Sequence, residues 1–160
     1  MRKLKIGIVG LGNMGTQHYH SISKQLVKRA EVTAVCDVDK TRLTKVASEV
    51  HQFSDSLEMI QSGSIEALLV ATPHYDHSSI GTKAIKHGLH LLVEKPIAVH
   101  KNACQELIEA YRQRPREQQV FCAMFNQRTD PRYLRIREMI RNGKMGEVRR
   151  INWIITDWFR

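Results

Sequence analysis

The stretch KIGIVGLGNMG, residues 5–15, decides the fold that we expect of this 160-residue chain. A short apolar segment leads into the pattern Gly-x-Gly-x-x-Gly at Gly10, Gly12 and Gly15, and the helix-like segment Met14–Arg29 follows. In a dinucleotide site the first glycine makes a tight turn, the second lets a pyrophosphate approach the backbone, and the third lets the helix pack on the strand. The helix N-terminus offers N–H groups to the phosphates. A purely structural glycine turn is the alternative.

Apolar runs and helix-like segments alternate along most of the chain. Strands are expected at Lys5–Val9, Val32–Cys36, Ile65–Ala71, Leu89–Val93 and Val120–Phe125. Helices are expected at Met14–Arg29, Thr41–Val50, His77–His87 and Asn102–Arg112. This alternation predicts an α/β fold, a Rossmann-type doubly wound parallel sheet that helices cover on both faces.

The last part of the chain departs from this alternation. A cap followed by proline opens a helix over 130–142, and Val148–Phe159 predicts one long apolar strand. A strand without a following partner element is a poor end for a domain. We therefore predict an NAD(P)-binding domain over 1–125 and, over 126–160, a linker, a helix and the first strand of a truncated second α/β domain.

Composition narrows the class of protein. Hydrophobic residues make up 42% and charged residues 26%, as in soluble globular proteins. No window reaches the ~18 consecutive apolar residues of a membrane span, so no membrane partner is expected. The odd set Cys36, Cys104 and Cys122 contains no CxxC pair, which favours a reduced, cytoplasmic protein. No cysteine or histidine spacing fits zinc, so no metal is expected.

The net charge of +9 suits either nucleic acid or an anionic small ligand. The arginines are dispersed, and zinc-finger and RNA-recognition motifs are absent from the sequence, so we expect no nucleic-acid partner. A basic nucleic-acid-binding module stays open as one alternative, and it predicts binding that weakens steeply with salt.

Asp37 stands 22 residues after Gly15, at the end of an expected strand. An acid there accepts hydrogen bonds from the adenosine ribose and repels a 2′-phosphate. Val38 follows it, where an NADP site more often supplies arginine, so the sequence favours NAD over NADP. Arg42 could reach back toward a 2′-phosphate, which leaves NADP open. A solvated acid at a strand end is the structural alternative.

Two further strand ends carry candidate residues, because ligands of parallel sheets bind beyond the carboxyl ends of the strands. After one strand stands Ala71-Thr72-Pro73-His74, where a threonine hydroxyl can bond phosphate or ribose. His74 and the nearby His77 could contact a cofactor or be structural.

After the next strand stands Glu94-Lys95-Pro96. A partly desolvated lysine beside a carboxylate can accept the hydroxyl proton while hydride leaves a carbinol carbon. A solvated surface pair of glutamate and lysine is the alternative.

With these motifs in order, the sequence resembles the Gfo/Idh/MocA family of glucose–fructose oxidoreductase, inositol dehydrogenase and rhizopine-catabolism proteins. The matching stretches are IGIVGLGNMG, CDVD, ATPHYDH, LLVEKPIA and FNQR…GKMGEVRRINW, and they span nearly all of the chain. The resemblance implies a Rossmann domain followed by an α/β domain that carries the substrate face and the contacts of a homo-oligomer.

The resemblance also implies roles for residues. Lys95 would be catalytic and touch both the substrate hydroxyl and the nicotinamide, and its bond to Pro96 can be cis. Trp158 and Arg160 would begin a segment that faces the site, and an aspartate–histidine pair would follow beyond Arg160. Motifs and resemblance together predict cofactor contacts at Gly10, Gly12, Asn13, Met14, Gly15, Asp37, Ala71, Thr72, Pro73, His74, His77, Glu94, Lys95, Asn126 and Arg128.

The expected function is an NAD(P)-dependent oxidoreductase that moves hydride between the nicotinamide, preferably of NAD, and a hydroxyl or keto carbon of a sugar, cyclitol or related polyol. The chain alone is expected to bind cofactor without turnover. The alternative is a non-catalytic NAD(P)-binding sensor of the same fold, against which the intact Glu-Lys-Pro motif argues.

Overall fold

The structure is a computed structural model, and it describes residues 2–154. The chain divides into two compact units, one that ends at Met124 and one that begins at Phe125. The break lies beside the domain boundary expected after residue 125. None of the helices in residues 2–154 has both the length and the apolar character needed to cross a bilayer.

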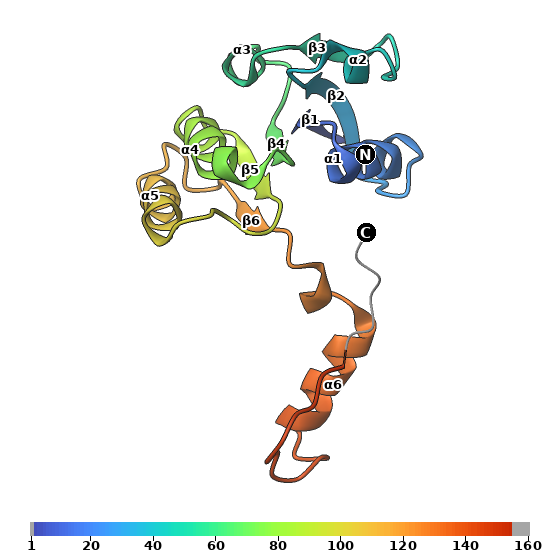
Figure 1. The fold of residues 1–160 in the computed structure, drawn as a ribbon, viewed down its shortest axis with the longest axis vertical. Coiled ribbons are helices and arrows are strands. Elements are labelled where there is room, and N and C mark those ends of the chain that lie inside the picture. Colours follow the sequence, from blue (N-terminus) through green and yellow to red (C-terminus); the bar gives the residue numbers. More distant parts are fainter. Residues whose placement is uncertain (1, 155–160) are drawn as a thin grey trace. The chain divides into compact units, whose positions relative to one another are not determined.

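The first unit is built around a six-stranded parallel sheet of order β3-β2-β1-β4-β5-β6 (Figure 1). Its strands are β1 (Leu4–Val9), β2 (Ala30–Cys36), β3 (His51–Phe53), β4 (Ala67–Val70), β5 (His90–Val93) and β6 (Phe121–Ala123). Its helices are α1 (Asn13–Ser23), α2 (Lys40–Leu43), α3 (Ser56–Gln61), α4 (His77–Lys86) and α5 (Lys101–Arg112), with a 3₁₀ turn η1 (His74–Asp76) before α4. The strand order reverses direction between β1 and β4, which is the doubly wound Rossmann topology. The predicted fold is confirmed.

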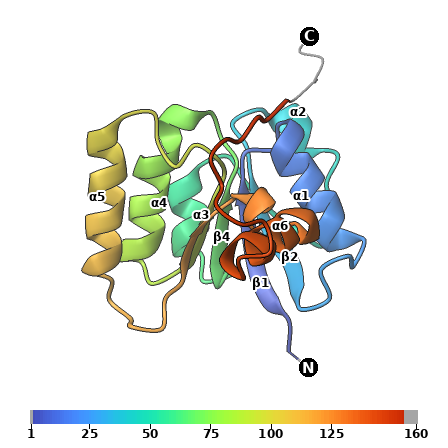
Figure 2. The same cartoon turned by 90° about the horizontal axis from the view of Figure 1, so that it is seen from below.

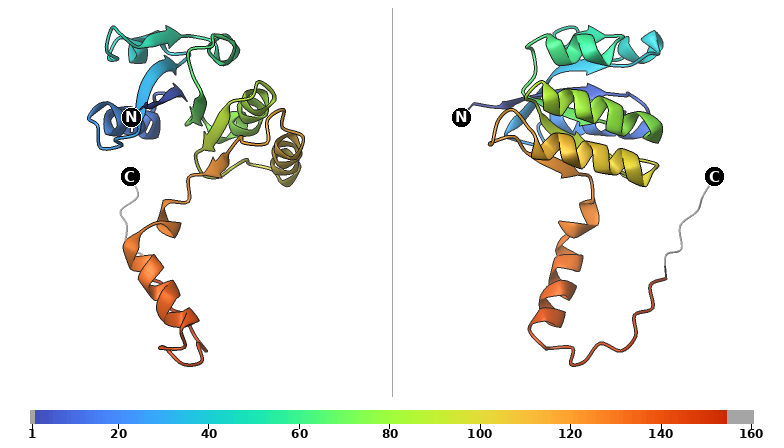
Figure 3. Two further views of the ribbon diagram at one scale, coloured as in Figure 1. Left: turned by 180° about the vertical axis from the view of Figure 1, so that it is seen from behind. Right: turned by 90° about the vertical axis from the view of Figure 1, so that its left-hand side faces the viewer.

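Helices cover both faces of this sheet. Helices α3, α4 and α5 lie side by side on one face, and α1 lies on the other (Figures 2 and 3). Because side chains alternate along a strand, neighbouring residues serve opposite cores. In β1, Ile8 packs toward Tyr19 on the α1 side, whereas Val9 packs toward Met59 and Ile85 on the other side.

The helix expected over Met14–Arg29 is shorter in the structure, because α1 ends at Ser23. Gln25 adopts a left-handed conformation with φ 58°. Its N–H donates to Ile22 O at 2.9 Å, and the Leu26 N–H reaches Ser21 O at 3.1 Å. These two bonds satisfy the last carbonyls of the helix and stop it, as in a Schellman motif.

The single helix expected over Thr41–Val50 is wrong. The structure has only the one-turn helix α2, capped by the Asp39 side chain, and then turns up to Val50. Two elements that the sequence analysis missed follow: the edge strand β3 and the helix α3, whose cap is Asp55. Each is six residues or shorter, so neither builds a recognisable apolar period.

The second unit contains η2 (Asn126–Arg128) and α6 (Pro131–Arg141). Asp130 caps α6 as expected, since its Oδ1 accepts the Arg132 N–H at 2.9 Å, and hydrogen bonds from Arg132 lower the pKa of that carboxyl to about 2. The strand expected over Val148–Phe159 is not formed in its described part, 148–154. A strand needs a partner for its backbone groups, and the described residues of this unit contain no other strand. Residues 155–159 of that prediction lie outside the described residues.

Candidate functional site

The carboxyl ends of the parallel strands meet at one edge of the sheet, and a cavity of about 660 Å³ opens there. The loops after β1, β2, β3 and β4 and the first turns of α4 line it. Six of the predicted cofactor positions lie in its wall: Gly10, Gly12, Asp37, Ala71, Thr72 and Pro73.

The three glycines of the loop meet different demands. Gly10 has φ +88°, and a Cβ there would lie 2.7 Å from Ala71 O, so the fold itself requires this glycine. A Cβ on Gly15 would collide with Gly10 O, so the packing of α1 on β1 requires that one. A Cβ on Gly12 would meet nothing within 4 Å. No atom within residues 2–154 requires a glycine at position 12, whereas a ligand group that approaches the backbone from the cavity would require one.

The first turn of α1 places backbone N–H groups next to the glycine loop. Gly12 is the residue before the helix, and no side chain caps it. The Thr16 N–H is bonded to Gly12 O at 2.9 Å, and the N–H groups of Asn13, Met14 and Gly15 precede this first helical bond. These donors and the helix dipole suit a phosphate.

Thr72 carries a buried side-chain oxygen, Oγ1, that has no hydrogen-bond partner within residues 2–154. Buried hydroxyls are nearly always bonded, because an unsatisfied one costs free energy. Thr72 also lines the cavity. The open space at Gly12 and the unsatisfied hydroxyl of Thr72 therefore both fit a polar ligand that carries phosphate and ribose groups.

Asp37 is 4% exposed and ties the end of β2 to the glycine loop. Its Oδ2 accepts the Leu11 N–H at 2.6 Å, and its Oδ1 accepts the Asp39 N–H at 2.9 Å. Arg42 Nη1 lies 3.3 Å from the same Oδ2, and Arg42 Nε lies 3.4 Å from Asp39 Oδ2. The acid that we expect at the ribose is thus fixed in place, and the arginine that could serve a 2′-phosphate is paired with two carboxylates.

The Glu94-Lys95-Pro96 turn follows β5 at this edge, and its Lys95–Pro96 bond is cis. We expected the Glu94 carboxylate to face the Lys95 ammonium, but it has other partners. Glu94 is only 5% exposed. Its Oε1 lies 2.7 Å from His18 Nε2, and its Oε2 accepts the Lys95 backbone N–H at 3.1 Å. Lys95 is exposed in the structure and not partly desolvated as expected, and its ammonium pairs with no carboxylate in the part of the chain that the structure describes. The lysine is therefore held by its backbone and free at its charged end.

His18 is the residue that sequence reasoning missed. A signal was present, because Gly15, Tyr19 and Ile22 form the buried face of α1 and His18 stands three residues after Gly15, on that same face. A histidine there must find a buried partner, and it finds Glu94.

His77 differs from the expected cofactor contact. It is fully buried, and both ring nitrogens face backbone carbonyls: Nδ1 lies 2.8 Å from Pro96 O and Nε2 lies 2.9 Å from Thr72 O. Both ring nitrogens face the protein, and the ring lies between the loops after β4 and β5, where its neutral form can donate to one of the two carbonyls. His74, in η1, is exposed and lies edge-on to that ring at 5.5 Å between centroids.

Cys36 lines the cavity but is not a reactive thiol. Burial, followed by the nearby charges of Asp55, Asp37 and Glu58, raises the pKa of the Cys36 thiol to about 12. That thiol stays neutral and is a poor nucleophile. Within residues 2–154, no group of three histidine, cysteine or acidic side chains could hold a metal ion.

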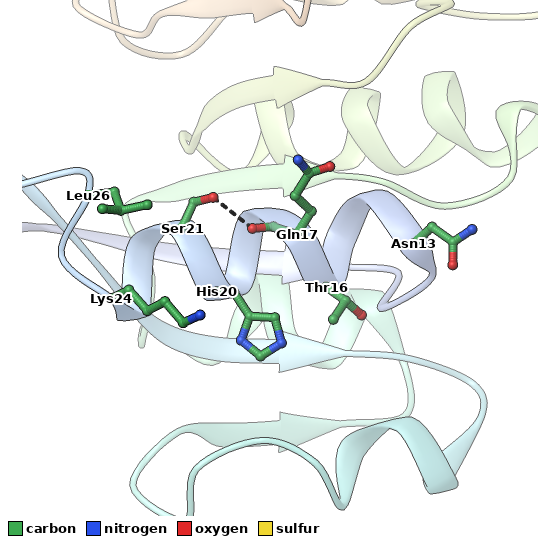
Figure 4. Close-up of a pocket in the computed structure, with 7 residues that line it drawn as sticks. All are labelled: Asn13, Thr16, Gln17, His20, Ser21, Lys24 and Leu26. Carbon is green, nitrogen blue, oxygen red and sulfur yellow. Dashed lines mark hydrogen bonds between the residues drawn. The ribbon is translucent and has the colours of Figure 1, made fainter. Parts of the chain in front are cut away.

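A second hollow, of about 390 Å³, follows the outer side of α1. Figure 4 shows Asn13 and Thr16 at one end of this hollow and Lys24 and Leu26 at the other. Its only drawn hydrogen bond is a local one, from Ser21 Oγ to Gln17 O at 2.9 Å. Asn13, a predicted cofactor residue, lines this hollow and is not among the residues that line the cavity at the strand ends.

Asn126 and Arg128 belong to the second unit, where they form η2. Their place beside the nicotinamide stays a prediction. The predicted site residues Trp158 and Arg160 lie outside the described residues.

Comparisons with known proteins agree with this fold. Residues 4–122 match the model of the GFO_IDH_MocA family, described as an oxidoreductase family with an NAD-binding Rossmann fold. Inositol 2-dehydrogenase of Salmonella typhimurium is 29% identical over 148 residues, which cover 90% of this chain and 43% of that protein. The enzyme of the same name from Rubrobacter xylanophilus is 30% identical over 146 residues, which cover 90% of this chain and 41% of that protein.

Solved structures give the same result. Scyllo-inositol dehydrogenase from Lactobacillus casei, solved with NAD(H) and scyllo-inositol, matches with a TM-score of 0.84 and 28% identity over 91% of this chain and 43% of that one. The WlbA dehydrogenase from Bordetella pertussis, solved with NADH and UDP-GlcNAcA, matches with a TM-score of 0.79 and 25% identity over 91% of this chain and 44% of that one. The chain thus spans about two-fifths of the length of the relatives it matches. It belongs to the Gfo/Idh/MocA family of oxidoreductases with an NAD-binding Rossmann fold.

Proposed function

We propose that this chain is the cofactor-binding part of an NAD-dependent dehydrogenase that acts on a CH–OH group of a cyclitol, a sugar or a related polyol. The observation that carries the proposal is the cavity at the strand ends, whose wall contains the bare backbone of Gly12 and the residue Thr72, whose buried hydroxyl has no partner within residues 2–154. The names of the matching relatives, inositol dehydrogenases among them, support the substrate class.

Different residues of the chain would bind different parts of the cofactor. The N–H groups at the start of α1 would hold the pyrophosphate next to Gly12, and Asp37 would accept hydrogen bonds from the adenosine ribose. Thr72 Oγ1 would gain the hydrogen-bond partner that residues 2–154 do not provide. NAD, when bound, supplies a hydride acceptor, and its reduced form supplies a hydride donor.

Lys95 would handle the proton. Oxidation of a carbinol carbon releases a hydride and the hydroxyl proton, and a neutral Lys95 Nζ would accept that proton as the ketone forms. In the reverse direction the same ammonium would return it. The backbone of Lys95 is anchored and its side chain is exposed, so the desolvation that favours a neutral amine would come from the bound cofactor and substrate.

The preference for NAD rests on Asp37 and Arg42. The buried carboxylate of Asp37 would repel a 2′-phosphate. Arg42, the nearest candidate to bind that phosphate, is already paired with Asp37 and Asp39. Both features favour the cofactor with a free ribose.

The test combines binding with turnover. The wild-type chain should bind NADH saturably in a fluorescence titration, and more weakly NADPH. In the full-length protein, Lys95→Ala should lower kcat with a cyclitol by about 100-fold or more and keep the Kd for NADH. Lys86→Ala, which removes an exposed lysine of α4, is the matched control and should change neither.

Two results would count against the proposal. A folded chain that binds neither NADH nor NADPH contradicts the cofactor site. A full-length protein that binds NADH but oxidises no polyol would instead support a non-catalytic sensor.

A further inference from the structure

The Glu94-Lys95-Pro96 turn is held from two directions by histidines of neighbouring helices. His18, on α1, places Nε2 2.7 Å from Glu94 Oε1. His77, the first residue of α4, places Nδ1 2.8 Å from Pro96 O. The residue before Lys95 and the residue after it are therefore each bonded to an imidazole ring.

Burial separates the parts of the turn that are fixed from the part that is free. His77 is fully buried, and the side chains of His18 and Glu94 are 17% and 7% exposed. Water competes poorly for hydrogen bonds in such surroundings, so these bonds are strong constraints. Lys95, in contrast, is exposed. The geometry fixes the lysine backbone and leaves its ammonium available.

The chemistry of the partners decides where the histidine protons lie. Carboxylate and carbonyl oxygens only accept hydrogen bonds, so His18 must carry a proton on Nε2, and His77 must carry one on Nδ1, if each is to hold the turn. The other nitrogen of His77 faces Thr72 O at 2.9 Å. A neutral ring donates to only one of these two carbonyls, so with the proton on Nδ1 it bonds Pro96 O, and Nε2 lies beside the loop that carries Thr72.

A buried histidine is often only a satisfied core residue. Here two histidines from different helices converge on one short turn, and the Glu94 carboxylate bonds both His18 and the backbone N–H of Lys95. We propose that His18 and His77 are positioning residues, which set where the Lys95 ammonium meets substrate and nicotinamide. This inference rests on the proposed function, in which Lys95 exchanges the substrate proton.

The first test replaces His18 in the full-length protein. His18→Leu keeps most of the volume and removes the donor, so kcat should fall by about 10- to 100-fold while the Kd for NADH stays unchanged. The pH profile of kcat should shift as well, because the lysine loses its fixed surroundings. His18→Gln can donate from its side-chain amide to Glu94, and it should restore most of the lost kcat.

His20→Leu is the matched control on the same helix, since His20 is exposed and makes no bond to the turn; it should leave kcat and its pH profile unchanged. His77→Gln should lower kcat as His18→Leu does, with thermal denaturation run alongside to measure the folded fraction. A purely structural role would lower the melting temperature but leave kcat per folded molecule and the pH profile unchanged, and that result would overturn the inference.

A second measurement needs no turnover. NMR of the wild-type 160-residue chain with ¹⁵N-labelled histidine should show a proton on Nε2 of His18 and on Nδ1 of His77. An unprotonated Nε2 on His18 would contradict the hydrogen bond from His18 to Glu94 and with it the positioning role.

The variant Lys95→Ala separates the two proposals. Retained turnover in that variant rejects the role of Lys95 itself. Loss of turnover there, together with a normal kcat in His18→Leu, rejects only the role of the histidines.

Discussion

Thr72 carries a buried hydroxyl that we expect to hydrogen-bond the cofactor. Thr72→Val keeps the side-chain shape and removes the hydroxyl that has no partner within residues 2–154. The free energy of unfolding should therefore stay the same or rise slightly, whereas the Kd for NADH should rise by about 3- to 10-fold, the value of one hydrogen bond. Chemical denaturation and a fluorescence titration measure the two effects.

Thr33→Val is the matched control for that experiment. Thr33 Oγ1 donates to Ser64 O at 2.8 Å, so its loss should destabilise the fold by about 1 kcal/mol and leave the Kd for NADH unchanged. If Thr72→Val instead destabilises the chain and binds NADH normally, the hydroxyl serves the fold and has no role at the cofactor.

Asp37 joins two tasks in one carboxylate, since it bonds the Leu11 N–H and faces the cavity. Asp37→Asn removes the charge and keeps one acceptor, which can serve Leu11 while the bond from the Asp39 N–H is lost; Asp37→Arg would lose both bonds. The ratio of the Kd for NADPH to the Kd for NADH should fall by about 10-fold.

Asp39→Asn controls for the Asp37 experiment. It removes one negative charge from the same loop, retains an acceptor that can cap α2, and does not line the cavity. We expect its ratio of NADPH to NADH affinity to stay close to that of the wild type. An equal change in both variants would mean that Arg42, released from either acid, sets the preference.

At this scale the sequence predicted residue types better than partners. Gly12, Asp37 and Thr72 could be found because strand ends and glycine spacing mark them without knowledge of the tertiary structure. The bond between His18 and Glu94 could not, because it joins residues 76 positions apart on different elements. His77 was found for its place beside Thr72, but its two carbonyl partners, which withdraw it from the ligand, depend on how the β5 loop packs.

Among the elements, α1 ends in a way that the sequence does not indicate. A helix is expected to stop at glycine, yet the left-handed position belongs to Gln25, with φ 58°. Gln25→Gly should raise the free energy of unfolding by about 0.5–1 kcal/mol, because glycine adopts this conformation without strain. Chemical denaturation measures the change.

Lys24→Gly is the control for α1, one residue earlier in the chain. Lys24 has φ −77°, which any residue adopts, so glycine there relieves no strain and should lower the free energy of unfolding by about 0.5 kcal/mol. A loss of stability in both variants would show that Gln25 is not strained in the native protein.

The predictability of the other elements follows their length and burial. Helix α4, ten residues long, ends before Gly88 at φ +82°, where glycine marked its end in the sequence. Short elements such as β3 and α3 were missed, because they take their place from the strand or helix beside them and carry too few residues to show a period.

At the scale of the whole molecule, the two units differ in how far their apolar residues are buried. The first unit has its own core on both faces of the sheet. In the second, α6 buries none of its residues within the described structure, and Ile151 and Ile154 are 72% and 84% exposed. The apolar pattern of 148–154 was visible in the sequence, but a pattern alone cannot form a strand without a neighbour to pair with.

This division predicts how the chain should respond to removal of its second unit. The glycine loop, Asp37 and Thr72 all lie in the first unit, whereas Asn126 and Arg128, expected beside the nicotinamide, lie in the second. A chain cut after Met124 should keep its circular dichroism spectrum and bind ADP-ribose with a Kd within about 2-fold of that of the 160-residue chain.

The family resemblance implies that Asn126 and Arg128 lie beside the nicotinamide, so on that prediction NADH, unlike ADP-ribose, should lose contacts in the shortened chain. We expect its Kd to rise by about 10-fold, which corresponds to about 1.4 kcal/mol of lost contacts. The double variant Asn126→Ala with Arg128→Ala in the 160-residue chain is the matched control and should show the same rise. Equal affinities for NADH in the 160-residue chain, the shortened chain and the double variant would show that neither Asn126 nor Arg128 contributes to binding of the cofactor. A loss of ADP-ribose binding on truncation would show instead that the first unit needs the second to form its cavity.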